Sequence, residues 1–438
     1  MGVAFGGLAS LLHAGMGLTA QAPDTTRRDS AVVLPPVTIA ATRSERELFA
    51  LPLAVSRVKP HTWFGTSGSG LSDALGLVPG VVSQSRAGGT DVRITIRGFG
   101  ARGAGDRSNS GTTRGIRVLL DGFPETEPDG RTSLDGIDLA AAHGVEVVRS
   151  NSSAVWGNAA GGVLSVSTVP ETEGRLLDGE AMAGSFALWR WALRGGVALG
   201  PGRALASVTR TEFGGWREHS ASDRSLVNLA FVTPPGHRTT VGVFAVGSDN
   251  FFEIPGPLTA AQVAADPAQA NSTYAQRNER RHNRVARLGA TFDHQATRSL
   301  GLSGMLYINP KYLQRSERGT FRDFTRYHLG GNVVARVATP LGSGLTGTLQ
   351  VGVDAAYQDG AILFYSLTPE GGRGDTLRAD QREGASNLGV FLQEELALGE
   401  RWAVTLGARW DDITYRAEDF LAPDLAARKS FQRLSPKL

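Results

Sequence analysis

Three glycines that follow a short alternating run have the spacing of a phosphate-binding loop. Gly98, Gly100 and Gly103 form a G-x-G-x-x-G pattern, which binds a dinucleotide when it opens a helix that receives the pyrophosphate. Residues 104–113 are instead mostly Gly, Ser, Asn, Thr and charged residues, with no apolar period. No helix is predicted there, so we interpret the glycines as part of a flexible loop.

The other residue types that carry out chemistry are absent or scattered. The chain has no cysteine, which excludes disulfides, zinc–thiolate sites and cysteine catalysis. Its eight histidines show no H-E-x-x-H or other paired spacing, and no nucleophile lies near a base in the sequence pattern. Arg373-Gly374-Asp375 matches an adhesion tripeptide, but three residues indicate little. We predict no enzyme active site, no metal site and no cofactor.

Composition limits the partners of the 438-residue chain. The formal net charge is only +3 and the arginines are scattered, so no nucleic-acid surface is predicted. No run reaches the ~18 consecutive apolar residues that a membrane-spanning helix needs. A chain of this kind can therefore span a membrane only as a closed β-barrel, because lipid leaves no partner for free backbone groups.

The glycine loop belongs to a set of short elements between residues 93 and 168. Of four successive stretches, the first three have the residue types of strands and their turns, and the fourth is a run of small residues. They are Arg93–Gly103, Gly115–Pro124, Val145–Ser150 and Asn151–Thr168. Asp121-Gly122 is typical of a tight turn, since both residues tolerate positive φ. Upstream, Leu71–Val81 has helical spacing that ends at Pro79-Gly80.

These elements resemble the plug domain of TonB-dependent outer-membrane receptors, in the family's order and with its spacing. The matching residues are Arg97-Gly98-Phe99, Leu120–Pro124, Glu146–Arg149 and Trp156–Val163. The sequence departs from the family at Ser150-Asn151, where Gly-Pro is usual, and at Ser165, where Asn is frequent. The resemblance covers about residues 37 to 168.

Within the family the chain is most similar to receptors for ferric siderophore-type chelates and for pyrroloquinoline quinone. The stretches that carry this closer likeness are Gly98–Arg102, Asp121–Pro124, Pro128–Gly130 and Asn278–Ala290. The resemblance implies active uptake of such a bulky, scarce ligand across the outer membrane of a Gram-negative bacterium. We expect Arg102, Arg107 and Arg131, in apical loops, either to bind an anionic or metal-bearing ligand or simply to be solvated.

The resemblance also implies a periplasmic partner, the TonB energy-coupling protein, which captures a short TonB box by strand addition. The β-prone run Val37, Thr38, Ile39, Ala40 and Ala41 is either this box or the first strand of the plug. About 15 residues separate it from the expected cleavage site, which leaves no room for an extra signalling domain, so a transducer role is not expected.

Plug arginines in this family form ion pairs with glutamates of the barrel wall, and the matching residues here are Arg97 and Arg149. Strand parity puts Gln393 and Glu395 on the lumen face, with Val390 and Leu392 on the lipid face. We therefore predict Glu395 as the barrel partner of the two arginines.

After Pro170 the sequence changes to alternating segments joined by short turns and longer polar loops, with Gly247–Arg281 and Gly360–Arg382 as the predicted long loops. Aromatic residues near strand ends fit the girdles of an outer-membrane barrel. About 12 strands are predicted. A closed barrel of 12 strands would have a backbone diameter of only ~24 Å, which is too narrow for a plug with a diameter of roughly 30 Å. The 22 strands that the family implies would give a diameter of ~44 Å.

The predicted fold is therefore mainly β: an antiparallel transmembrane β-barrel, about half of 22 strands, with an N-terminal α+β plug in its lumen. The predicted divisions are a signal peptide over 1–22, a periplasmic segment over 23–48, the plug over 49–169 and the partial barrel over 170–438. The predicted partners are TonB, a ferric chelate or similar bulky small molecule, and outer-membrane lipid. The alternatives are a buried amphipathic helix for the first segment, a soluble β-protein, a smaller barrel with a partly expelled plug, a passive pore or binding-only protein, and a non-functional fragment.

Overall fold

The fold is taken from a computed structural model of the chain. The residues it describes are 38–39, 46–47, 53–63, 66, 70–87, 91–100, 114–169, 175–233, 238–342, 345–399 and 402–437. The chain divides into two compact units, Met1–Val37 and Thr38–Leu438, and the first lies outside the described residues. The description below concerns the second unit. No helix in the described ranges is both long enough and apolar enough to cross a membrane.

The N-terminal part of this unit contains three small sheets. A five-stranded sheet has the order β3-β9-β10-β7-β8, with β10 parallel to β7 and antiparallel to β9. A three-stranded sheet has the order β4-β5-β6, and β1 pairs with β2. The strands are β1 (Thr38–Ile39), β2 (Arg46–Glu47), β3 (Val55–Val58), β4 (Val81–Ala87), β5 (Asp91–Ile96), β6 (Phe99–Gly100), β7 (Ile116–Leu120), β8 (Phe123–Pro124), β9 (Gly144–Val148) and β10 (Gly162–Ser167). The short helices are η2 (Pro60–Thr62), α1 (Ser72–Leu75) and α2 (Ser153–Trp156).

The strands predicted between residues 93 and 168 are confirmed, and their alternation builds the core. Ile94 and Ile96 on β5 are fully buried in one core cluster with Val118 on β7, a strand of the five-stranded sheet. The predicted turn at Asp121-Gly122 is also present, with φ of 53° and 84°. Asp121 accepts hydrogen bonds from Thr168, which fixes this turn against the end of β10.

Twelve antiparallel strands form the second sheet, and each pairs with the next along the chain. They are β11 (Leu176–Gly184), β12 (Leu188–Leu199), β13 (Gly202–Phe213), β14 (Ser222–Val232), β15 (Thr239–Glu253), β16 (Arg280–Gln295), β17 (Leu300–Glu317), β18 (Thr320–Gly342), β19 (Leu345–Leu367), β20 (Arg373–Leu398), β21 (Trp402–Asp419) and β22 (Ala427–Lys437). Among the described strands, β11 and β22 do not pair with each other, so the sheet is open. The predicted partial barrel of about 12 strands is confirmed.

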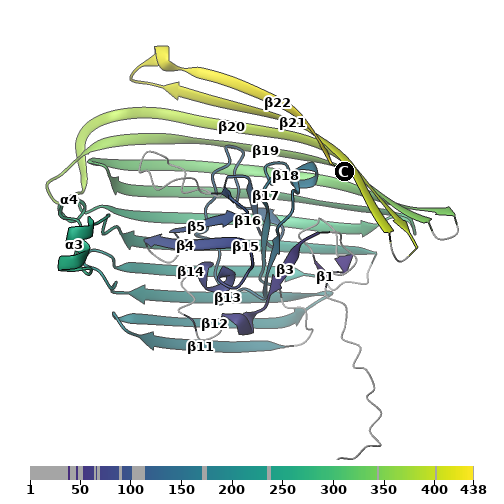
Figure 1. The fold of residues 1–438 in the computed structure, drawn as a ribbon, viewed down its shortest axis with the longest axis horizontal. Coiled ribbons are helices and arrows are strands. Elements are labelled where there is room, and N and C mark those ends of the chain that lie inside the picture. The colour runs from purple at the N-terminus through teal and green to yellow at the C-terminus, as the bar shows by residue number, and fades with distance from the viewer. Residues whose placement is uncertain are drawn as a thin grey trace, which may run out of the picture. The chain divides into compact units, whose positions relative to one another are not determined.

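The two faces of this sheet have opposite character. One face exposes large apolar side chains, such as Leu306 and Leu392, to the surroundings. The other buries polar side chains, such as Arg287 and Gln393, against the small sheets, which lie on that face (Figure 1). A soluble sandwich would bury its apolar face, so this inverted arrangement is typical of a wall that faces lipid.

Connections differ between the two ends of the sheet. Short turns such as Gly200-Pro201 lie at one end, and helices α3 (Ala260–Ala265) and α4 (Ser272–Gln276) lie in a long loop at the other (Figure 1). The last connection contains the short helix η3 (Pro423–Leu425).

Three sequence predictions about lengths were wrong. The helix predicted over Leu71–Val81 is the single turn α1, because Gly76 and the Pro79-Gly80 turn end it early. The long loop predicted over Gly360–Arg382 is mostly strand, since β19 and β20 continue to within five residues of each other. The loop predicted over Gly247–Arg281 is likewise shortened by β15. Strands that extend beyond the lipid have polar residues on both faces, which removes the alternation that sequence reasoning uses.

Candidate functional site

A segment rich in carboxylates connects the small sheets to the wall. Residues 121–138, here called the acidic strap, follow β7 and run across the polar face of the large sheet. Its six acidic residues are Asp121, Glu125, Glu127, Asp129, Asp135 and Asp138. Four of the six are buried, and the exceptions are Asp121 and Asp129. Because buried carboxylates need partners, their contacts indicate what holds the strap in place.

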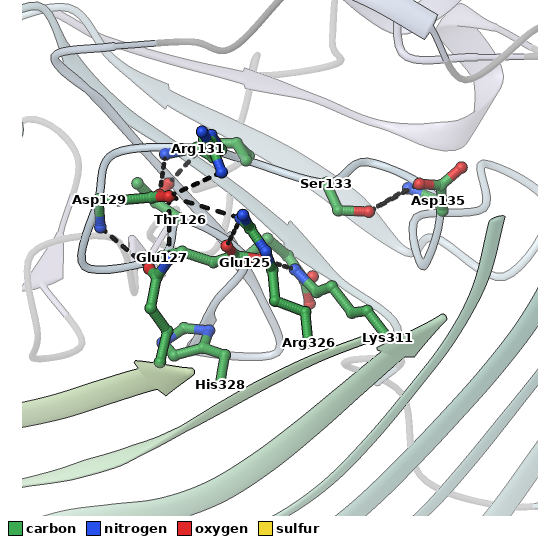
Figure 2. Close-up of polar contacts among 12 residues, drawn as sticks. Glu125, Thr126, Glu127, Asp129, Arg131, Ser133, Asp135, Lys311, Arg326 and His328 are labelled. Atoms are coloured by element: carbon green, nitrogen blue, oxygen red, sulfur yellow. Dashed lines mark hydrogen bonds and ion pairs between the residues drawn. The ribbon is translucent and has the colours of Figure 1, made fainter. Parts of the chain in front are cut away.

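Glu127 is the centre of the strap's ionic contacts. Its carboxylate lies 2.5 Å from Nζ of Lys311 on β17 and 2.9 Å from Nη1 of Arg326 on β18. The side chains of all three residues are at most 8% exposed. Figure 2 shows both cations reaching from the wall toward the strap. Arg326 also lies 3.4 Å from Asp129, so one wall arginine bridges two strap carboxylates.

A second buried cation, Arg287 on β16, holds the start of the strap. Its guanidinium lies 2.5 Å from Glu125 and 3.9 Å from Asp121. It also stacks over the Phe123 ring, with 5.0 Å between the guanidinium carbon and the ring centroid. This cation–π contact adds to the attraction because neither partner is hydrated.

The last third of the strap is held by neutral donors as well as by arginines. Asp135 accepts hydrogen bonds from the side-chain amides of Asn250 at 2.7 Å and Asn283 at 3.2 Å. Arg224 donates to the main-chain oxygens of Asp135 and Ile137. Further on, Asp138 accepts a hydrogen bond from Thr209 and lies 4.0 Å from Arg190. The strap is thus attached to consecutive strands from β12 to β18.

The ion pairs change the acidity of Glu127. Burial alone would raise the pKa of its carboxyl, but Lys311 and Arg326 beside it hold that pKa well below its usual range. A carboxyl whose pKa is lower in the folded than in the unfolded state stabilises the fold above the unfolded pKa, about 4.3. That stabilisation is lost as the pH falls further, toward the folded pKa.

This gives a pH prediction for the strap. The difference in unfolding free energy between the wild type and Glu127→Gln should stay constant from about pH 8 to pH 5 and shrink below about pH 4. Urea unfolding of the N-terminal sheets at a series of pH values measures it. A difference that disappears already near pH 6 would contradict the ion-paired state of Glu127.

Beside the strap lies a cavity of about 1570 Å³. Its lining comes from the strap, from the loop and helix around α2, and from wall strands β17 to β22. The lining mixes apolar with polar and charged side chains, and several of its carboxylates are paired with cations. Glu383 lies 3.0 Å from Arg131, and Arg409 lies 2.6 Å from Asp354 and 2.9 Å from Asp411.

The predicted ligand-binding arginines are only partly within the described residues. Arg131 lines the cavity, where its guanidinium is paired with Asp129 at 3.4 Å and with Glu383 at 3.0 Å. Arg102 and Arg107 lie outside the described residues. A ligand role for the three arginines stays a prediction.

The predicted TonB box is described only at its centre. Thr38 and Ile39 form β1, which pairs over two residues with Arg46 and Glu47. Val37, Ala40 and Ala41 lie outside the described residues.

The two arginines predicted to pair with the wall lie together within the small sheets. Arg97 donates to the main-chain oxygen of Arg149 at 2.9 Å, and Arg149 donates to that of Pro79 at 3.0 Å. Glu395 accepts a hydrogen bond from Gln393 at 2.9 Å. The structure does not bring the two arginines and Glu395 together as an ion pair within the described ranges, so that pairing stays a prediction.

Sequence reasoning missed the acidic strap. The predicted ion pairs joined N-terminal arginines to a wall glutamate, whereas in the strap N-terminal carboxylates pair with cations of the wall. A signal was present in the sequence. Six carboxylates occur within 18 residues, and Arg287, Lys311 and Arg326 occupy lumen-facing positions on three successive strands. Charges of opposite sign in two such patterns are a reason to expect contact. Within the described residues, no group of three or more acidic or histidine side chains is arranged to hold a metal ion.

Family models match both parts of the chain. The TonB-dependent Receptor Plug Domain matches residues 48–163, and the TonB dependent receptor-like β-barrel matches residues 215–438. The second match alone covers more than half of the chain. The chain belongs to the TonB-dependent receptors. The five-stranded and three-stranded sheets with the acidic strap form the plug, and the twelve-stranded sheet is barrel wall. Members of this family are transport receptors of the outer membrane, not enzymes, and this receptor is an outer-membrane protein.

Known proteins similar to the receptor include a hemin receptor from Yersinia enterocolitica, which is 31% identical over 160 residues. That match covers 35% of this chain and 21% of the relative. Among solved structures, the unliganded ferric citrate transporter FecA has a TM-score of 0.75 at 17% identity, covering 92% of this chain and 62% of that chain. The siderophore receptor PiuA from Acinetobacter baumannii has a TM-score of 0.68 at 14% identity, covering 90% and 62%. The receptor chain therefore spans less than two thirds of each of these relatives, and the structural likeness concerns the fold alone.

Proposed function

We propose that the receptor takes up a bulky iron chelate across the outer membrane, with energy supplied by the TonB protein of the periplasm. The observation that carries this proposal is the cavity of about 1570 Å³ between plug and wall, which is larger than the 300–1,000 Å³ typical of small-molecule sites. A cavity of this size beside an ion-paired plug suits a large ligand that must wait for the plug to move.

The ligands of the similar proteins favour iron. One relative is a hemin receptor, and two structural neighbours are a ferric citrate transporter and a siderophore receptor. None of these three is a receptor for pyrroloquinoline quinone, so an iron chelate is the better proposal for this chain.

Each part of the chain has a role in the proposed uptake. The segment Val37–Ala41 is bound by TonB through strand addition, because that mode needs backbone hydrogen bonds rather than particular side chains. The ligand is received at the apical side by Arg102, Arg107 and Arg131. Pulling on the bound segment then remodels the plug.

The test is accumulation of radioactive iron by cells that produce the receptor and lack other iron-chelate receptors. Ferric citrate and ferrichrome, supplied separately, cover an anionic and a neutral chelate. Uptake of at least one chelate that requires TonB supports the proposal. Equal uptake with and without TonB would make the receptor a passive pore, and binding without any uptake would make it a binding-only protein.

A further inference from the structure

The α2 turn of the plug lines the cavity, and a wall arginine reaches across to it. Val155, Trp156 and Gly157 are all part of the cavity lining. Arg409 on β21 donates a hydrogen bond from Nη1 to the main-chain oxygen of Val155 at 3.2 Å. This oxygen belongs to the last turn of a helix, where carbonyl groups have no partner within the helix itself. Arg409 therefore supplies a contact that the four-residue helix α2 cannot make alone.

Two carboxylates of the wall fix the guanidinium of Arg409. Its Nη1 lies 2.6 Å from Asp354 on β19, and its Nε lies 2.9 Å from Asp411 on β21. The Arg409 side chain is only 2% exposed, so water screens these contacts little. The two hydrogens of Nη1 are both used, one by Asp354 and one by the Val155 oxygen. The charge of Arg409 is thus balanced within the wall, and its contact with the plug is a directional hydrogen bond.

Two glycines leave room for this guanidinium. A methyl group at Gly389 on β20 would overlap Nη2 of Arg409, and one at Gly157 would lie 3.2 Å from the same nitrogen. Gly157 has a φ of 68°, which glycine adopts without strain. Gly389 has no positive φ, so the space beside Arg409, and not the backbone, favours glycine at that position. We call Gly157, Asp354, Gly389 and Asp411 the Arg409 socket.

Apolar packing holds the same part of the plug against the wall. Val155 and Trp156 belong to a buried cluster that includes Val334 on β18 and Phe391 on β20. Hydrophobic contacts are non-directional, so they keep α2 on the wall without fixing its orientation. The hydrogen bond from Arg409 adds that direction. Loss of the guanidinium should therefore loosen α2 locally, while the apolar cluster and the acidic strap keep the plug seated.

We propose that Arg409, held in its socket, is a positioning residue that fixes the α2 turn and thereby the shape of the cavity side formed by residues 150–158. All nine of these residues line the cavity. Arg409 acts through α2 and not on the ligand, because its donors are directed to two wall carboxylates and one plug oxygen. The consequence for ligand binding rests on the proposed function, whereas the positioning of α2 does not.

Hydrogen–deuterium exchange of α2 in the purified receptor in detergent is the first measurement. The amides of residues 155–157 donate to the main-chain oxygens of Ser152 and Ser153, so their exchange reports opening of the turn. Arg409→Ala removes the guanidinium, whereas Gly389→Ala displaces it and keeps the charge. The matched control is Gly247→Ala on β15, because a methyl group there meets nothing within 4 Å and Gly247 does not line the cavity.

We expect Arg409→Ala and Gly389→Ala each to speed the exchange of α2 about tenfold, as the loss of one hydrogen bond to a charged group implies. Exchange of the strap, and of α2 in Gly247→Ala, should stay unchanged. Ethylguanidinium at millimolar concentration should restore slow exchange in Arg409→Ala, whose socket is empty, and not in Gly389→Ala, whose methyl group occupies it. Exchange of α2 that Gly389→Ala leaves unaltered, an equal rise in the strap, or rescue of both variants would overturn the positioning role.

Binding of ferric citrate and of ferrichrome tests the consequence for the ligand, with quenching of tryptophan fluorescence as the readout, since Trp156 lines the cavity. A chelate that the wild type binds should bind Arg409→Ala about tenfold more weakly, and ethylguanidinium should restore its affinity. Unchanged affinity despite faster exchange of α2 would overturn the claim about cavity shape and leave the proposed function standing. Failure of the wild type to bind either chelate would overturn the proposed function and the claim about the ligand with it, while the exchange of α2 still decides whether Arg409 positions that turn.

Discussion

Deletion of Val37–Ala41 is expected to reduce energised uptake of iron chelate to background while leaving chelate binding unchanged. The structure places Thr38 and Ile39 in a strand that pairs over only two residues, with Arg46 and Glu47. Such a short pairing costs little to break, so the segment can exchange its partner for an edge strand of TonB. Thr38 and Ile39, the two residues of this segment that the structure describes, do not line the cavity, which is why binding should survive.

Point substitutions separate the strand mechanism from a simple effect of shortening the chain. Ile39→Pro removes a backbone donor, whereas Ile39→Ala keeps it, and strand addition depends on that donor. Uptake should therefore be lost in the proline variant and retained in the alanine variant, with radioactive iron accumulation as the measurement. Normal uptake after the deletion would mean that the energy-coupling protein binds elsewhere.

Substitution Glu127→Gln is expected to lower the unfolding free energy of the plug by about 3 kcal/mol, because it leaves a buried cation without its carboxylate. Lys311 has Glu127 as its ion-pair partner at 2.5 Å and is 3% exposed, so water cannot take over this role. Arg326 keeps two carboxylate partners after the substitution, because Asp129 and Glu383 each lie 3.4 Å from it. Urea unfolding of the plug in detergent-solubilised receptor measures the change.

Two further variants test whether the loss comes from the buried ion pair. Glu383→Gln removes a carboxylate that contacts the same Arg326 but is 36% exposed, so a change of less than about 1 kcal/mol is expected. Combining Glu127→Gln with Lys311→Met removes both charges and should recover most of the stability. Equal effects of Glu127→Gln and Glu383→Gln would show that the strap is not held by its buried charges.

Local turn chemistry made the plug elements predictable from the sequence. Asp121-Gly122 adopts the positive φ values that favour these residue types, and β7 and β9 lie where the alternation placed them. The wall strands within the lipid band were also predictable, because one face must be apolar. Beyond that band the rule fails, and this is why the sequence predicts a loop over Gly360–Arg382, where the structure has strands.

The site was less predictable because its contacts join distant parts of the chain. Glu127 and Lys311 are 184 residues apart, and no local pattern indicates which wall strand a plug residue will face. The family likeness pointed to arginines of the plug, and the structure instead shows carboxylates of the plug against cations of the wall. Counting charges on lumen-facing positions would have indicated this polarity, since Arg287, Lys311 and Arg326 are all on that face.

The central claim is that the acidic strap fixes the plug to the wall through its buried carboxylates. Hydrogen–deuterium exchange of the strap's amides measures this most directly, because the Glu125 amide donates a hydrogen bond to the main-chain oxygen of Val118 on β7, and the Glu127 amide donates one to that of Arg131 within the strap. We predict slow exchange in the wild type and exchange faster by about 100-fold in Glu127→Gln, the factor that corresponds to about 3 kcal/mol, with β15 to β17 unchanged. Exchange of the strap that is fast in the wild type, or unaltered in the variant, would contradict the claim.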